Sequence, residues 1–261
     1  MTPQSIAAVN QLSPAEKTVI YRRFIPGVLM ERFGFAPNFK DKQGRDLLRL
    51  ECKEGSTEVI LDLRHRHDAK DPLLYAHITD TINGQLHILL YIVNDPESPR
   101  FDVDRLPDGT KTDFGTIKRN IDAEFAAMSA GLAPGQVRKG LRILKYSIRA
   151  FEDFAYSLGH SLYFVEPLYY HNAVIFERYG FAYQQGLKRM YKISEQFAEG
   201  GNLYLKLDNS TPFRMQGMER SIRGRSWSIH DGILGEPYTY VTMYKTIEGI
   251  ASINTFPDSI W

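Results

Sequence analysis

The chain has 261 residues, of which 43% are apolar and 24% are charged, an ordinary globular composition. Its net charge of +1 gives no reason to expect nucleic acid, a membrane surface or a strongly acidic partner. Cys52 is the single cysteine, which excludes a disulfide framework and a thiolate metal cluster and fits a reducing cytoplasm. The first residues lack the basic and apolar regions of a signal peptide, and no apolar run is long enough to span a bilayer. We therefore expect a cytoplasmic protein.

The N-terminal forty residues carry helix signals. Ser13 to Glu16 reads as a capping box with proline at the first helical position. This pattern predicts a helix to about Phe24, an interruption at Pro26-Gly27, and a second helix through Phe33. Gly34 then suits the left-handed residue that ends a helix.

A series of strands follows from about residue 45. Asn83-Gly84 is a strong hairpin signal, and the run from Leu86 to Val93 is apolar on both faces, which predicts a central strand. Residues 100–105 could add an edge. The four strands of this meander are predicted at 45–52, 57–65, 73–82 and 85–93.

The rest of the chain alternates between helical and strand patterns. The last sixty residues are harder to assign, because two strand-like runs flank a Gly- and Arg-rich connection without a clear period. Alanine content favours a helix at 117–130. In order, we predict helices at 117–130 and 137–158, a strand at 161–165, a helix at 169–179, and strands at 181–193, 202–208 and 237–245.

This order predicts an α+β fold with a largely antiparallel sheet. A parallel element is expected where a helix joins two strands. Along the chain we expect a helical lead at 1–44, a core at 45–195 and a C-terminal extension at 196–261 packed on that core.

Two similar nine-residue stretches stand far apart, VLMERFGFA at 28–36 and VIFERYGFA at 174–182. Each ends a predicted helix on a glycine that is followed by phenylalanine, and glycine adopts positive φ without steric penalty. Only the second copy precedes a convincing strand. We interpret the repetition as a corner used twice and not as a duplicated functional unit.

The segment around the second copy resembles the core of the GNAT superfamily of acyl-CoA N-acyltransferases. The family has a proline-led loop, a long helix, a strand, a shorter helix that ends near G-F, and another strand. Pro134 and Gly140 keep the separation of the loop motif, while its final small residue falls on Arg142. The resemblance covers roughly sixty residues at motif level and implies a GNAT-like fold. It would place a strand, not a helix, directly before the loop.

The resemblance implies that the loop binds acetyl-CoA or another acyl-CoA. A pyrophosphate needs free backbone N–H groups at a helix N-terminus with cations nearby. The same residues also fit a proline-started helix with a basic outer face. The candidate cofactor-binding residues are Gln136, Val137, Arg138, Lys139, Gly140, Leu141, Arg142 and, on the shorter helix, Asn172.

The implied activity is acyl transfer to a small-molecule amine or a peptide. This reaction needs a base for the amine and an acid for the departing thiolate. Glu166, at the end of the strand at 161–165, is the candidate base, although it also fits a solvated strand end. The family's acid tyrosine falls on Phe176, which leaves Tyr179 as the candidate acid. The alternative is a non-catalytic GNAT-like protein that binds a ligand or partner.

Two other groups of residues are candidates for chemistry. His65, His67 and Asp68, with His77 and His87 on neighbouring strands, could hold a metal, although a polar strand end is the preferred interpretation. The tail has a pair, His230-Asp231, that could orient a base, but no nucleophile motif accompanies it. Tail arginines and Trp227 could bind an anionic or aromatic ligand, including across the subunit interface of a homodimer, but a solvated connection or a lid over the main cleft is the preferred interpretation. Those arginines are Arg214, Arg220, Arg223 and Arg225.

Overall fold

The structure is a computed structural model that describes residues 3–112 and 118–261. It confirms the α+β class, because helices accompany an open sheet with the strand order β1-β2-β3-β4-β5-β7-β6. The strands are β1 Leu48–Glu51, β2 Glu58–Leu63, β3 Leu74–Asp80, β4 Leu86–Val93, β5 Leu162–Val165, β6 Ala182–Gln185 and β7 Thr242–Thr246. The helices are α1 Ile6–Val9, α2 Pro14–Tyr21, η1 Arg22–Phe24, α3 Gly27–Phe33, α4 Ile121–Ser129, α5 Leu144–Ser157, α6 Tyr170–Arg178, α7 Leu187–Phe197, α8 Asn202–Leu205, η2 Met218–Arg220 and α9 Ile222–His230.

The chain forms two compact units, and each unit consists of three separate segments. Unit 1 comprises Met1–Glu97, Gly140–Glu166 and Tyr244–Gly249. Unit 2 comprises Ser98–Lys139, Pro167–Met243 and Ile250–Trp261.

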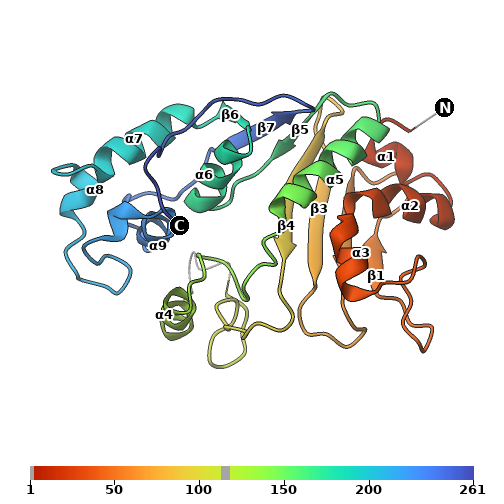
Figure 1. Ribbon diagram of the computed structural model, residues 1–261, viewed down its shortest axis with the longest axis horizontal. Coiled ribbons are helices and arrows are strands. Elements are labelled where there is room, and N and C mark those ends of the chain that lie inside the picture. Colours follow the sequence, from red (N-terminus) through yellow and green to blue (C-terminus); the bar gives the residue numbers. More distant parts are fainter. Residues whose placement is uncertain (1–2, 113–117) are drawn as a thin grey trace. The chain divides into compact units, whose positions relative to one another are not determined.

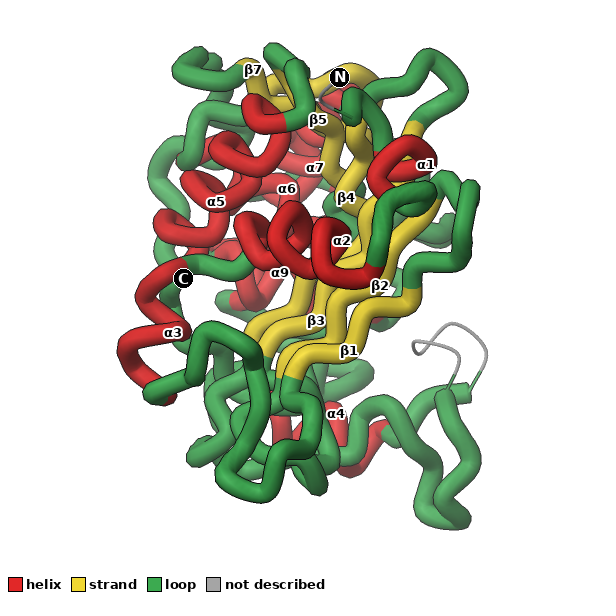
Figure 2. Tube along the Cα trace, turned by 90° about the vertical axis from the view of Figure 1, so that its right-hand side faces the viewer, coloured by secondary structure: helices red, strands yellow, loops and turns green. Residues whose placement is uncertain are grey.

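Unit 1 contains the predicted four-stranded antiparallel meander, β1 to β4. One face of it is fully buried, with Val59, Leu61, Leu74 and Ala76 all at 0% exposure. Helices α2, α3 and α5 lie along this face (Figures 1 and 2). The predicted parallel element is confirmed, because α5 connects β4 to β5 and these two strands pair in parallel. The apolar run of β4 therefore has strands on both sides.

Aromatic rings fix α5 and η1 on the sheet. The Phe24 ring stacks on Phe151 at a centroid distance of 4.4 Å and meets the edge of Tyr91 of β4 at 5.9 Å. The Tyr91 hydroxyl donates to Ser147 Oγ at 2.9 Å, so the one polar group of this cluster is paired. These contacts set the direction of α5 relative to β4.

The helix signals of the N-terminal segment are confirmed. The Ser13 side chain accepts from the Glu16 N–H, and the Glu16 carboxylate accepts from the Ser13 N–H at 3.0 Å, which completes the capping box. The helix then tightens into η1, and α3 follows after Pro26.

The two similar stretches form the same helix end. Gly34 has φ +60° and Gly180 has φ +77°, both in the left-handed region. The next residue in each case is a phenylalanine whose N–H bonds back into the helix, Phe35 to Met30 O at 3.1 Å and Phe181 to Phe176 O at 3.2 Å. This is the pattern of a Schellman motif. Only the second copy leads into a strand, β6, as the sequence indicates.

Several strand predictions are wrong. Residues 181–193 form the short strand β6, then Gly186 at φ +99°, then helix α7, whose apolar spacing buries Met190, Ile193 and Phe197. Residues 202–208 contain helix α8 instead of a strand, and residues 100–105 form turns. The helix predicted over 117–130 is confirmed from Ile121 to Ser129, and its first residue, 117, lies outside the described residues.

Unit 2 is mainly helical and has its own core. Trp227 and Phe213 stack with ring centroids 5.1 Å apart, and Met128 packs against them.

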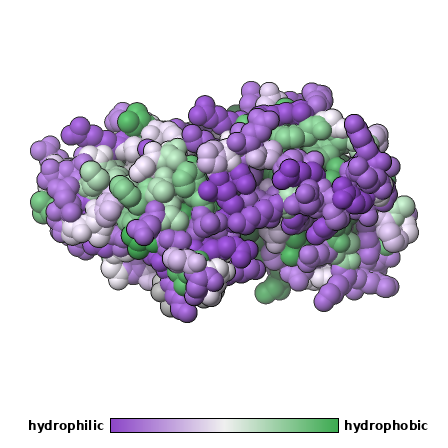
Figure 3. Space-filling model, turned by 90° about the horizontal axis from the view of Figure 1, so that it is seen from below, coloured by the Kyte–Doolittle hydropathy of each residue, from purple (hydrophilic) through white to green (hydrophobic). Residues whose placement is uncertain are grey.

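The molecular surface visible in Figure 3 is largely hydrophilic, with smaller hydrophobic areas. Over residues 3–112 and 118–261, the structure has no helix with the length and apolar character that crossing a bilayer requires.

Candidate functional site

The pairing of β4 with β5 in unit 1 stops where β4 has an irregularity. Ile88 is opposite Ile78 of β3, but the next pair is Leu90 with His77, so Leu89 is an extra residue that forms a β-bulge. The β5 pairs involve His87 and Ile88 only, while β4 continues to Val93. A bulge bends its strand and ends regular pairing, and bulges are common beside active sites. The parallel pairing therefore ends at the carboxyl end of β5, and ligands of α/β sheets bind at the carboxyl ends of strands.

His87 and Glu166 meet at this position. Glu166 follows the last residue of β5, and its N–H donates to Ile88 O at 3.1 Å. His87 Nε2 lies 3.3 Å from Glu166 Oε2, an ion-pair distance outside hydrogen-bond geometry. The side chains are 18% and 31% exposed. The strand register places His87 on the sheet face opposite the buried one, so this pair and α5 lie on opposite faces of the sheet.

The N-terminus of α5 follows an irregular turn at the end of β4. A Cβ on Gly140 would lie 3.4 Å from Val93 O, so the chain passes close over the end of the strand. Arg142 is exposed and has φ +58°, a left-handed conformation that side chains other than glycine rarely adopt. Ile143 is the N-cap residue and supplies no side-chain hydrogen bond, and the first turn has no acidic residue. The first N–H groups of α5 thus have no side-chain cap, which suits an anion.

The prediction of one helix over 137–158 is wrong for its first two turns. Val137 O accepts from the Phe101 N–H at 2.8 Å, and Val137 packs with the cluster of Val103, Ala127 and Leu132 in unit 2. Leu141, four residues on, is buried within unit 1. The helical spacing of these apolar residues therefore arises from two separate cores and not from one helix face.

The remaining candidate loop residues have partners in unit 2. Gln136 Oε1 accepts from the Ala133 N–H at 2.8 Å, and the Arg138 guanidinium donates to Ser98 O. The Lys139 N–H donates to Ser98 Oγ at 3.2 Å. The division between the two units falls inside the predicted loop, between Lys139 and Gly140.

The candidate residues of α6 lie at its two ends. Asn172 Oδ1 accepts from the Tyr169 N–H at 3.2 Å, so this amide caps its own helix. Tyr179 is the half-buried C-cap residue. Phe176, at the position of the family's acid tyrosine, packs against Phe181 with ring centroids 4.9 Å apart.

The histidines of the metal hypothesis are not gathered into one site. His77 Nε2 lies 3.0 Å from Glu58 Oε2, and His87 faces Glu166 instead. Within the part of the chain that the structure describes, no three His, Cys, Asp or Glu side chains form a group that could hold a metal ion.

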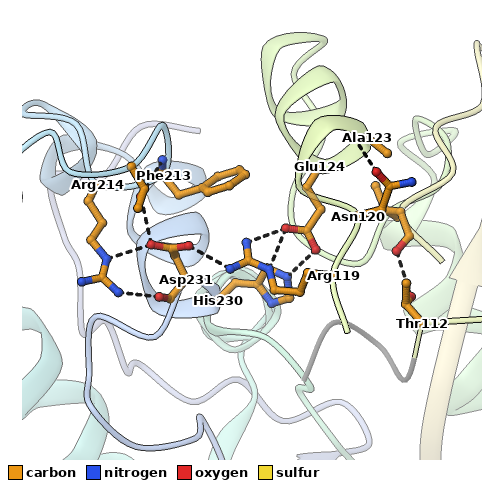
Figure 4. A network of polar contacts seen from close by, with 11 residues as sticks. Thr112, Arg119, Asn120, Ala123, Glu124, Phe213, Arg214, His230 and Asp231 are labelled. Carbon is orange, nitrogen blue, oxygen red and sulfur yellow. Dashed lines mark hydrogen bonds and ion pairs between the residues drawn. The ribbon is translucent and has the colours of Figure 1, made fainter. Parts of the chain in front are cut away.

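A buried charged network in unit 2 connects α4 to α9 (Figure 4). Glu124 is 2% exposed and accepts from Arg119 at 2.9 Å, and His230 Nε2 lies 3.1 Å from its other oxygen. Asp231 accepts from Arg119 and Arg214, both at 2.8 Å. The hypothesis that Asp231 orients His230 is therefore wrong, because the partner of His230 is Glu124, more than a hundred residues earlier in the chain.

Burial shifts the pKa values in this network. Burial alone would raise the pKa of Glu124, but the hydrogen bonds from His230 and Arg119 more than offset this and lower it. Burial lowers the pKa of His171 to about 3, with a smaller contribution from His230. His171 Nδ1 is 2.8 Å from Ser226 Oγ, and the Tyr169 ring stacks on the imidazole. These contacts are internal to unit 2 and hold α4, α6 and α9 together.

The tail is not a solvated connection. Trp227 is 1% exposed and donates from Nε1 to Leu132 O at 2.9 Å. Arg223 donates to Met128 O at 2.7 Å, and the buried Arg225 guanidinium lies over the rings of Phe197 and Phe256. These side chains build the core of unit 2, and the helix α9 carries most of them.

Sequence reasoning missed two features of the site where β4 and β5 stop pairing. Leu89 has no glycine or proline nearby to indicate a bulge, and the apolar run reads as a regular strand. The His87–Glu166 contact joins strands that a long helix separates, and a parallel register cannot be read from the residues.

Comparisons of this chain with models of protein families, with curated proteins and with solved structures found no match.

Proposed function

We propose that this protein binds an acyl thioester of coenzyme A, acetyl-CoA or a longer acyl-CoA, at the N-terminal end of α5 and transfers the acyl group to an amine. The observation that carries the proposal is that β4–β5 pairing ends at Ile88 beside the Leu89 bulge, while the uncapped start of α5 follows a turn that passes over the end of β4 at Val93. From α5 to β6 the order helix, strand, helix, strand agrees with the GNAT resemblance, whereas helix α4 precedes the loop where the resemblance places a strand.

The donor has two parts that suit this geometry. Its pyrophosphate is an anion that backbone N–H groups at the start of α5 can bind, with Arg142 and Lys145 supplying positive charge. Its pantetheine arm is extended and contains two amides, which can pair with strand backbone as an added strand does. The part of β4 beyond Ile88 that β5 does not pair would receive this arm.

The acceptor amine would approach from the opposite face, where Glu166 and His87 lie. The amine nitrogen attacks the thioester carbonyl carbon, the C–S bond breaks, and the thiol of coenzyme A leaves. Glu166 is the proposed base that takes the proton from the nitrogen, and the departing thiolate takes a proton from water. Tyr179, the acid expected from the sequence, belongs to unit 2 and is not part of this proposal. General acid or base groups typically contribute 10²- to 10⁴-fold in rate.

A second candidate function is acyl-CoA binding without transfer. The observation that favours it is Phe176, which has no proton to give and is packed against Phe181. The two functions share the donor site and differ in whether thiol is released when an amine is present.

The first test is thermal unfolding with coenzyme A and acetyl-CoA for the wild type, Arg142→Glu and the control Lys53→Glu, which reverses an exposed charge in a turn of unit 1. A ligand at a hundredfold over its dissociation constant adds about 2.7 kcal/mol of stability. We expect both ligands to raise the midpoint of the wild type and of the control, and not of Arg142→Glu. No midpoint shift at millimolar ligand would overturn the proposal.

Catalysis is tested by thiol release from acetyl-CoA with a panel of amines and short peptides. We expect Glu166→Gln to lower kcat by about a hundredfold, in the range for loss of a general base, while the midpoint shift with coenzyme A stays unchanged. If the wild type binds the donor but releases no thiol with any acceptor, the second candidate function is the correct one.

A further inference from the structure

The outer side of α5 presents an exposed surface, here called the α5 face. Its spacing places five residues on one side of the helix, opposite the buried residues Ser147, Phe151 and Phe154. Tyr146 is 56% exposed and Tyr156 is 75% exposed, which is unusual for such large side chains. The α5 face consists of Lys145, Tyr146, Arg149, Asp153 and Tyr156.

Charge is unevenly distributed along this helix. The cations, Lys145 and Arg149, lie in its N-terminal half, and the acidic residues, Glu152 and Asp153, lie in its second half. A helix dipole favours the reverse order, with acidic groups near the N-terminus. The arrangement therefore weakens the helix itself and concentrates positive potential at the end where β4 and β5 separate. This local excess of positive charge is not apparent from the net charge of +1 for the whole chain.

A bound pyrophosphate does not account for the whole face. A phosphate on the first N–H groups of α5 would be close to Arg142 and Lys145. At 1.5 Å per residue, Arg149 lies about 8 Å and Tyr156 about 18 Å along the helix axis from Leu144, the first residue of α5. Within the described residues, no acidic side chain forms an ion pair with Lys145 or Arg149. The remaining part of the face is without an assigned role.

The residue types and the shape indicate a protein partner. Small molecules bind in concave sites, whereas the outer side of a helix is convex. Tyrosine and arginine are among the residues that most often dominate protein interfaces, and the α5 face has two tyrosines and one arginine. At the N-terminal half of the face, where Lys145 and Arg149 lie, charge complementarity favours an acidic partner.

We propose that the α5 face docks a small acidic carrier protein that presents the acyl group as a thioester on a phosphopantetheine arm. This inference rests on the proposed function, because the arm is the same as that of coenzyme A and would enter at the same end of β4. The transfer step is also the same: the amine replaces the thiol at the acyl carbon, and the carrier leaves with a free thiol on its arm.

The test is a titration of the full chain with a purified bacterial acyl carrier protein, with and without its phosphopantetheine arm, at 50 and 200 mM salt. We expect micromolar binding of both forms, weakened several-fold by salt. The double variant Lys145→Glu/Arg149→Glu should weaken binding at least tenfold, Tyr146→Ala should also weaken it, and Lys53→Glu should not. Circular dichroism of each variant checks that it is folded.

The outcomes separate this inference from the proposed function. If coenzyme A still raises the unfolding midpoint but neither form of the carrier binds, the docking inference is wrong and the donor site stands. Carrier binding that the charge-reversed variant retains would also overturn it, because binding would then use another surface. Carrier binding through α5 without any response to coenzyme A would refute the proposed donor and keep the docking surface.

Discussion

Arg142 holds a backbone conformation that favours glycine, at φ +58° directly before the N-cap of α5. A left-handed conformation costs a side-chain-bearing residue roughly 1–2 kcal/mol. Strained residues of this kind cluster at functional sites, where the surrounding structure holds them. The sequence motif of the proposed resemblance has a small residue where this chain has Arg142, so a cation occupies that position here.

The strain at Arg142 leads to a prediction about stability. We expect Arg142→Gly to raise the free energy of unfolding by about 0.5 kcal/mol, because the relief of strain exceeds the greater flexibility of glycine in the unfolded chain. The same change should weaken coenzyme A binding, since the cation is lost. Urea denaturation and calorimetric titration measure the two effects. Arg142→Ala is the control, and an alanine variant more stable than the glycine variant would contradict the strain.

Helix α4 depends on a charge pair that joins it to α9. Glu124 of α4 pairs with His230 of α9, and Arg119, just before α4, pairs with both Glu124 and Asp231 (Figure 4). Buried ion pairs therefore hold the start of α4 to the end of α9. Removal of one member of a buried pair is strongly destabilising, because the other charge loses its compensation. The contribution of this network is therefore structural.

The Glu124 network predicts a stability change with pH. Its pKa is lowered in the folded state, so its stabilising contribution is complete above the unfolded value near 4.5 and is lost as pH falls through the lower folded value. We expect Glu124→Gln to cost roughly 3–5 kcal/mol at neutral pH and to remove this acid-dependent loss. Urea midpoints from pH 7 to 3 measure both effects. Glu54→Gln, an exposed control, should follow the wild type, and equal slopes for wild type and Glu124→Gln would refute the assignment.

Elements with local signals were predicted well from the sequence. The capping box at Ser13, the glycine corners at Gly34 and Gly180, and the Asn83-Gly84 hairpin depend on backbone chemistry within a few residues. The elements that failed depend on distant contacts. Residues 137–139 are held by Ser98 and Phe101, and the strand pattern of 181–193 is broken by Gly186, where a Cβ would lie 2.8 Å from Tyr240 O.

The same distinction between local signals and distant contacts applies to the residues of the candidate site. Glu166 and the basic residues before α5 follow from motif order. The bulge at Leu89 and the contact of His87 with Glu166 follow from register, which is set by packing across strands that are far apart in the sequence.

At the scale of the whole molecule, acid stability should depend on the buried His171 as well as on Glu124. His171 is 3% exposed, and burial lowers its pKa to about 3, so the folded state excludes a proton that the unfolded chain binds below about pH 6.5. The free energy of unfolding should then fall by about 1.4 kcal/mol per pH unit as pH drops from about 6.5 toward 3.

The variant His171→Asn isolates this dependence. It should flatten the decline between pH 6.5 and 4.5, a window above that of Glu124, while the partly exposed control His67→Asn should leave it unchanged. Urea denaturation across this range is the measurement. A decline that persists in His171→Asn would assign the proton uptake to another group.

The interleaving of the two units has a consequence for biosynthesis. The chain passes from one unit to the other after residues 97, 139, 166, 243 and 249. Unit 1 lacks its last segment until Tyr244–Gly249 has left the ribosome, and unit 2 needs residues that follow it. Neither unit has all of its segments on a nascent chain that stops short of residue 249. The meander of unit 1 and the helices α2, α3 and α5 on its buried face are made first, and the strand next to β5 comes from a six-residue segment made some eighty residues after β5.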